Sequence, residues 1–184
     1  MQTKPIRPSC QSVLVEVNVR WLRQALQLLE RMDDRSYATE PALAPHRAGA
    51  HLRHILEFYQ CFLEGLELGR IDYDARRRNH AVEHSRRAAA EMIHSLICAL
   101  ETHHAVREGR TVGVRMEDAD PNRLRDSFME SSVSRELQAL SSHTVHHFAL
   151  IAVTLRLHGV TIEPDFGMAL STLRYLASGA AEAA

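Results

Sequence analysis

Apolar residues recur every three to four positions in four long stretches of the chain. This period places them along one side of an α-helix, so each stretch predicts an amphipathic helix. Glycine follows three of the four stretches, at the position where it commonly ends a helix. The predicted helices span about residues 12–32, 46–68, 79–108 and 134–158.

The remaining segments predict shorter elements. The polar, proline-containing residues 33–45 predict a loop. Apolar and other side chains alternate over residues 112–116, which favours at most a short extended piece there. A last short helix is expected over about residues 167–176, after Pro164.

Four long helices joined by modest connections predict an all-α fold, a helical bundle with a short extra C-terminal helix. Neither an internal repeat nor a long linker divides the sequence. We therefore expect a single helical domain over residues 1–184, with its core over about residues 10–176.

The composition excludes several classes of protein. The 184 residues are 45% apolar and 24% charged, close to the averages of globular proteins. A formal net charge of -1 lacks the basic surplus of a general nucleic-acid binder, so no nucleic-acid partner is expected. The longest apolar run, Phe148 to Val153, is far below the roughly 20 residues of a membrane span. Three cysteines and no apolar leader segment favour the cytoplasm.

Histidine is unusually frequent, with 12 copies against 8 glycines. In the segment SHTVHHFALIAV, residues 142–153, His143 and His147 are four positions apart. On a helix they project from one face with their Cβ atoms about 5 to 6 Å apart, a spacing that suits one divalent ion. His146 lies three positions after His143 and is an alternative to His147.

The second predicted helix offers a third imidazole. His54, in the segment AHLRHILEFY, lies on the flank of the apolar stripe. Facing helices in a bundle are about 8 to 10 Å apart, so one histidine of this helix can reach the pair on the fourth. Three imidazoles with an open fourth position form a known catalytic zinc geometry. His51 competes with His54 for this role.

This layout, one histidine on the second helix and H-x-x-x-H on a late helix, resembles the DinB-like (DinB/YfiT-type) superfamily of metal-binding four-helix bundles. The similarity covers about residues 10–176. It implies an up-down-down-up bundle with one long crossover connection. It also implies a divalent metal ion on His54, His143 and His147. Many members follow the second histidine of the pair with Arg-Gly-Gln, whereas Phe148, Ala149 and Leu150 stand here.

The resemblance also implies a class of function. Members include thiol-dependent transferases and isomerases, so we expect a metal-dependent enzyme, a thiol-dependent transferase or a hydrolase. Its partner would be a small thiol or another small molecule. Imidazole ligands suit zinc, nickel, iron and copper alike. The alternative hypothesis is a non-catalytic bundle with a structural metal or none, which acts through a protein partner or as a homodimer. Such a homodimer would form through the first and fourth helices, an ordinary interface for a bundle of this kind.

Other residues carry weaker expectations. Glu57, one turn after the second-helix histidine, could orient an imidazole or act as a base, but an exposed carboxylate is the commoner case. Cys61 is expected to be a small buried residue. The Asp- and Arg-rich loop of residues 71–79 could bind an anion, with local Asp–Arg pairing that caps the third helix as the commoner case. His80 and His84 are expected on the surface.

Overall fold

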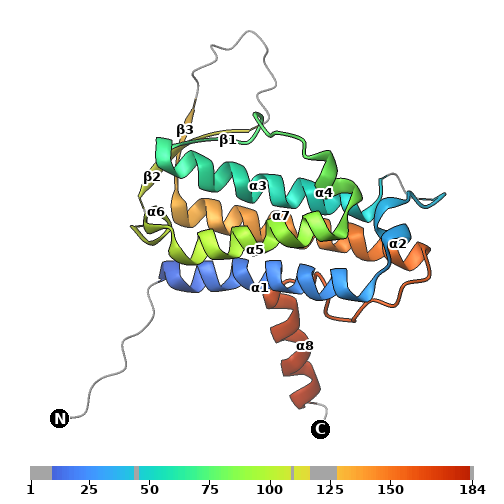
Figure 1. The fold of residues 1–184 in the computed structure, drawn as a ribbon. Helices are drawn as coiled ribbons and strands as arrows, with labels where there is room; N and C mark the ends of the chain where they lie inside the picture. The colour runs from blue at the N-terminus through green and yellow to red at the C-terminus, as the bar shows by residue number, and fades with distance from the viewer. Residues whose placement is uncertain (1–9, 44–45, 109, 117–127, 183–184) are drawn as a thin grey trace.

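The computed structural model describes residues 10–43, 46–108, 110–116 and 128–182. Most of these residues are helical (Figure 1), which confirms the predicted helical class. The helices are α1 (Cys10–Arg31), α2 (Asp34–Ala38), α3 (Ala48–Leu68), α4 (His80–His84), α5 (Arg86–Thr102), α6 (His104–Glu108), α7 (Val133–Leu157) and α8 (Leu170–Glu182). The strands are β1 (Arg70–Asp72), β2 (Thr111–Arg115) and β3 (Met129–Ser132).

The four long helices α1, α3, α5 and α7 form the body of the molecule (Figure 1). Both α1 and α3 pack against α5 and α7, which closes a four-helix ring. Asn18 of α1 forms a hydrogen bond with Leu137 of α7, and Trp21, further along α1, forms one with Ser141, further along α7. These two helices therefore run in the same direction. Bonds between α1 and α5, and between α3 and α7, occur in the opposite order. Thus α1 and α7 point one way, and α3 and α5 point the other.

The prediction of one helix over residues 79–108 is wrong, because this stretch forms α4, α5 and α6. Ser85 leaves the helical conformation, with φ -130° and ψ 113°, and its hydroxyl accepts a hydrogen bond from the Ala88 amide. It caps α5, a contribution of about 1 kcal/mol in typical proteins. His103 makes the second break, with ψ 119°. The apolar period continues across both breaks, so periodicity alone misses them.

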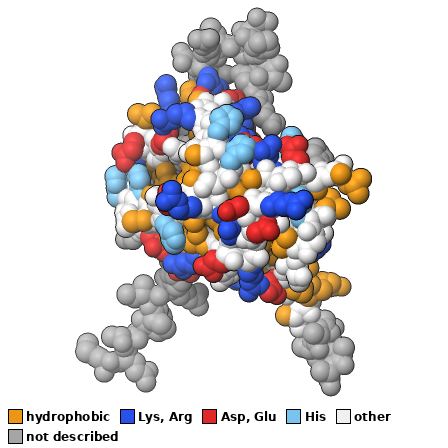
Figure 2. All heavy atoms as spheres, turned by 45° about the vertical axis from the view of Figure 1, so that its right-hand side comes forward, with side chains coloured by type: hydrophobic (Ala, Val, Ile, Leu, Met, Phe, Trp, Pro, Cys, Tyr) orange, Lys and Arg blue, Asp and Glu red, His pale blue; other side chains and the backbone are white. Residues whose placement is uncertain are grey.

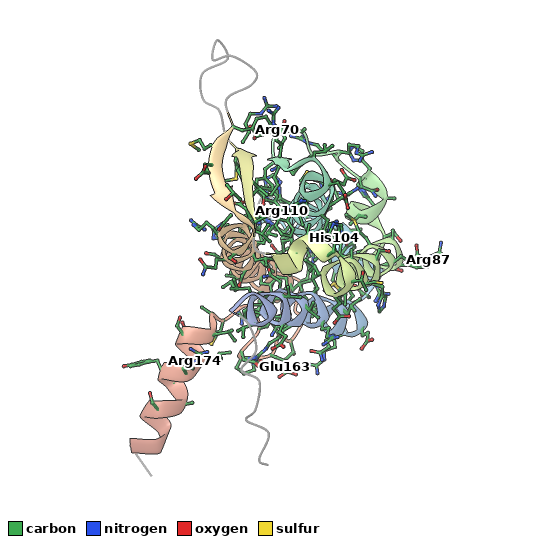
Figure 3. The ribbon with its side chains drawn as sticks, turned by 90° about the vertical axis from the view of Figure 1, so that its left-hand side faces the viewer. Arg70, Arg87, His104, Arg110, Glu163 and Arg174 are labelled. Carbon is green, nitrogen blue, oxygen red and sulfur yellow. The ribbon has the colours of Figure 1, made fainter. Side chains whose placement is uncertain are left out.

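Two further boundaries differ from the prediction. Residues 33–45 contain a short helix, α2, which begins where the Asp33 carboxylate accepts a hydrogen bond from the Ser36 amide at 2.7 Å. The last helix, α8, starts and ends later than predicted, at Leu170 and Glu182. It projects away from the bundle (Figures 1 and 3).

A three-stranded sheet lies along α3 and α7. Its central strand, β2, is the predicted extended piece, whereas β1 and β3 were not predicted. β2 pairs with β1 in parallel and with β3 in antiparallel fashion. Gly69, with φ 66°, ends α3 and turns the chain directly into β1. At Gly65 an added Cβ would lie 2.6 Å from the carbonyl oxygen of Arg70, so this glycine lets the strand return closely over the helix.

The core is apolar with a small polar network inside it. Tyr59 donates a hydrogen bond to Asn18 Oδ1 at 2.7 Å, and its hydroxyl lies 3.2 Å from the hydroxyl of Thr144. Asn18 donates in turn to the Leu137 carbonyl at 3.0 Å. Each such buried bond contributes about 1 kcal/mol net and would cost more if broken on one side only. The network ties α1, α3 and α7 together beside His143.

The surface shows no field of a single charge on the face drawn in Figure 2, where acidic and basic side chains are interspersed. Within the described ranges, no helix combines the length and the apolar character needed to cross a membrane.

Candidate metal centre

The three histidines singled out by their spacing meet between α3 and α7. Nε2 of His54 lies 3.1 Å from Nε2 of His143. The ring of His147 has its centroid 4.6 Å from that of His54 and 4.5 Å from that of His143. One ring nitrogen of each residue lies within 4.8 Å of the others. Metal–nitrogen bonds of about 2.0 to 2.1 Å in a tetrahedron place ligand nitrogens about 3 to 3.5 Å apart, so the first pair is already at ligand spacing.

Burial keeps these imidazoles neutral. It lowers the pKa of His54 and His143 to about 4 and that of His147 to about 3. Burial is the largest cause of these shifts, and neighbouring positive charge contributes to them, from nearby histidines and, for His54 and His143, from Arg76. Metal binding requires unprotonated nitrogens, so at neutral pH all three rings are in the form that can bind an ion.

Hydrogen bonds to the protein do not explain why these three rings are buried. Nδ1 of His143 is buried and has no hydrogen-bond partner among the described residues. Its other nitrogen faces a nitrogen of His54, and two neutral imidazoles can share only one proton along that line. A satisfied core histidine would have a carbonyl or hydroxyl at each nitrogen. The donor set, three neutral nitrogens facing one another, fits a divalent metal ion.

The two alternative ligands occupy different places. Nδ1 of His51 lies 3.2 Å from Nδ1 of His147, so these two atoms share a hydrogen bond. This bond leaves Nε2 of His147 as the nitrogen available to an ion and holds its ring in place, as residues behind metal ligands commonly do. His146 is exposed, and its ring meets that of His147 edge to face at a centroid distance of 5.2 Å.

Aromatic side chains and one arginine close the site on the side of the sheet. The ring of Phe58 lies 4.2 Å from that of His143 and 4.8 Å from that of His54. Tyr73 stacks on Phe58 at 5.0 Å, and the guanidinium of Arg76 lies 4.5 Å from the Phe58 centroid. The positive charge of Arg76 favours an anion near the histidines.

A pocket of about 430 Å³ opens beside His143, between the sheet and α7. This volume is within the range of small-molecule sites, about 300 to 1,000 Å³. The lining is mainly apolar, with two carboxylates, one guanidinium and two hydroxyl groups besides the histidine. The lining residues are Phe58, Tyr73, Val114, Met116, Met129, Glu130, Ser131, Arg135, Glu136, Ala139, Leu140 and His143.

The expectation that Glu57 is exposed is wrong, since its exposed fraction is 2%. Its carboxylate accepts a hydrogen bond from the Asn79 amide at 2.8 Å and lies 3.6 Å from Nε of Arg53. Glu57 therefore holds the loop before α4 and does not orient an imidazole. Cys61 is half-buried against the core, and burial raises its thiol pKa to about 11.

Ion pairs join the loop of residues 71–79 to neighbouring elements. Asp72 pairs with Arg115 of β2, and Arg77 pairs with Glu64 of α3 at 2.8 Å. The cap of α4 is Asn79, whose side chain accepts hydrogen bonds from two amides of the first turn. The helix start is thus capped by an amide and not by an Asp–Arg pair. His80 and His84 are exposed, as predicted.

Glu136 was not singled out from the sequence. It is buried, lines the pocket and lies seven positions before His143 on the same face of α7. That two-turn spacing is the signal in the sequence that could have found it. A second histidine cluster, Glu67 with His103 and His104, also offers three ligand atoms within 4.8 Å of one another. It lies at the end of the bundle where His104 is labelled in Figure 3.

No family model matches the sequence. The fold is that of DinB-like proteins: the crystal structure of a DinB-like protein, YjoA of Bacillus subtilis, superposes with a TM-score of 0.59. That match covers 83% of this chain and 95% of the other, at 18% identity. The DinB-like resemblance drawn from the histidine spacing is therefore confirmed in the fold.

One curated protein is also similar in sequence. A 107-residue match, 58% of this chain, is 32% identical to FK506-binding protein 5 of Rhizopus delemar. The match spans only 27% of the length of that protein.

Proposed function

We propose that this protein is a metal-dependent enzyme of the DinB-like type, acting on a small molecule in the cytoplasm. The observation that carries the proposal is the position of three neutral imidazoles, His54, His143 and His147, beside an apolar pocket of about 430 Å³. An ion that only stabilises the fold does not require a pocket beside one of its ligands.

A divalent ion, zinc, nickel or iron, supplies Lewis-acid activation of a thiol or a water molecule when bound at such a site. The chain supplies the rest. Three neutral ligands add no negative charge, and Arg76 adds a positive one, so an anionic reactive group is favoured. His51 holds the ring of His147, and Phe58 and Tyr73 exclude water from one side.

Thiol transfer is the chemistry we favour. The sulfur of the thiol forms a bond to an electrophilic carbon, the bond from that carbon to its leaving group breaks, and the thiol proton passes to solvent. The apolar walls of the pocket suit an organic thiol as the attacking group better than a water molecule. Hydrolysis is the other reaction that the same ligands allow.

The test is an assay of untagged, metal-loaded protein. Thiol transfer to 1-chloro-2,4-dinitrobenzene releases chloride, and hydrolysis of 4-nitrophenyl acetate releases nitrophenolate. We expect a metal-dependent rate in the first assay that His143→Ala abolishes and His103→Ala keeps. Equal rates with and without metal in both assays would contradict the proposal.

We also propose that the protein is a homodimer. Leu150, Val153 and Leu157 form an exposed apolar row on α7, and the projecting helix α8 exposes Tyr175 and Leu176. A 13-residue helix is marginally stable alone in water, so α8 needs a surface to pack against. Light scattering should give twice the chain mass for the wild type and a monomer for Val153→Glu.

A further inference from the structure

Glu136 places a buried carboxylate in the wall of the pocket. Its exposed fraction is 6%. The hydroxyl of Tyr73 donates to one carboxylate oxygen at 3.0 Å, and the hydroxyl of Ser131 donates to the other at 2.6 Å. Burial and the negative charge of Glu136 raise the pKa of Tyr73, so the phenol keeps its proton and remains a donor.

Among the described residues, no cation balances the charge of this carboxylate. Within the described part of the chain, no arginine, lysine or histidine forms an ion pair with Glu136. Two hydroxyls fill only two of about four acceptor positions. A buried charge is costly unless a cation accompanies it. Glu130 and Arg135 lie on the exposed rim of the pocket, and their opposite charges cancel. Glu136 therefore gives the pocket wall its net negative charge.

Glu136 and His143 mark opposite ends of the pocket. They are seven residues apart on α7, which is about 10.5 Å along the helix axis. Ala139 and Leu140 line the stretch between them, and Phe58 and Met129 add further apolar wall. Along α7 the lining thus runs from the carboxylate of Glu136 to His143, with apolar side chains between them.

We propose that this pocket binds an elongated amine: a primary ammonium group on Glu136, an apolar chain along Ala139 and Leu140, and a metal-directed group, such as a thiol, at the His143 end. Only that last contact rests on the proposed function. The ammonium would donate to the free acceptor positions of the carboxylate and supply the missing positive charge.

The test compares three probes of equal length, 6-aminohexane-1-thiol, 6-mercaptohexan-1-ol and hexane-1-thiol. Each is titrated anaerobically into cobalt(II)-loaded protein, and the thiolate-to-cobalt absorption band reports binding. We expect the aminothiol to bind at least tenfold tighter than the other two. Glu136→Gln should remove this preference and leave the affinity for hexane-1-thiol unchanged. Glu130→Gln, a carboxylate on the rim of the same pocket, should keep the preference.

Equal affinities of the three probes for the wild type would overturn the inference, as would a preference that survives in Glu136→Gln. The comparison of ammonium with hydroxyl on the wild type needs no variant, so it decides the question even if Glu136→Gln does not fold. If no cobalt band appears, the proposed metal function fails. Calorimetry of hexylamine on metal-free protein then decides the inference: binding to the wild type and not to Glu136→Gln supports it, and no binding overturns it.

Discussion

The described residues include two clusters of possible metal ligands that use their ring nitrogens in opposite ways. In the cluster of His54, His143 and His147, ring nitrogens face one another and Nδ1 of His143 has no partner among the residues described. In the other cluster, Nδ1 of His103 accepts a hydrogen bond from the Ala105 amide at 3.2 Å.

The remaining nitrogen of His103, Nε2, lies 2.9 Å from a carboxylate oxygen of Glu67. A neutral imidazole has one donor and one acceptor nitrogen, so this ring has no lone pair left for an ion. Three possible ligands within reach of one another are therefore not sufficient to make a metal site. What distinguishes the two clusters is whether an imidazole keeps a lone pair for an ion.

Removal of one ligand should give the largest difference between the clusters. His143→Ala should lower the affinity for zinc by more than 100-fold, because loss of a residue that only orients a ligand already costs about 10–100-fold. Its circular dichroism should stay helical, since apolar side chains supply the core. Calorimetric titration measures the affinity, with His103→Ala as the matched control. Equal losses in the two variants would remove the distinction.

Replacement of His51, which lies behind the ligand His147, should have an intermediate effect on zinc affinity. His51→Ala breaks the bond between the two Nδ1 atoms and frees the ring of His147. We expect zinc affinity to fall by about 10–100-fold. His146→Ala removes an exposed neighbour that makes no such bond and should leave the affinity unchanged. A larger loss in His146→Ala than in His51→Ala would mean that the assignment of His147 is wrong.

The stability of the metal-free protein should depend on pH through the first cluster. The pKa of His54 and His143 is about 4 in the folded protein, against about 6.5 in an unfolded chain. Between these values the unfolded chain binds more protons, so the free energy of unfolding falls as the pH drops from about 6.5 to 4. Urea unfolding across this range measures the effect. His143→Ala should flatten the profile, and a profile identical to wild type would contradict the burial argument.

The smallest effect is expected at the second cluster. Glu67 is exposed, with 63% of its side chain accessible, and exposed ion pairs contribute about 1 kcal/mol or less. Glu67→Gln should therefore change the free energy of unfolding by no more than about 1 kcal/mol and leave zinc binding untouched. A second bound zinc that Glu67→Gln removes would show that His103 does ligate a metal.

The residues that sequence analysis could place are those governed by local periodicity. His143 and His147 share a helix face because they are four residues apart, and His54 follows from the stripe of its own helix. The break at Ser85 escaped notice because the apolar stripe continues through it.

The residues that were misplaced or missed from the sequence depend on distant partners. Glu57 is buried because the Asn79 amide, 22 positions away, binds its carboxylate. Glu136 is held by Tyr73, which is 63 positions away and reaches it after the chain leaves α3 through β1. The strands β1 and β3 are likewise defined by their pairing with β2. The spacing from His143 places Glu136 on a helix face, but the long-range contacts that bury it leave no period in the sequence.

Diffraction from crystals grown with zinc, recorded at the zinc absorption edge, tests the central claim most directly. We predict one anomalous peak per chain, with nitrogens of His54, His143 and His147 at about 2.0 to 2.1 Å from it. The side of the ion toward the pocket lined by His143 and Glu136 should carry no protein ligand. A peak between Glu67, His103 and His104, with none at the first cluster, would contradict it.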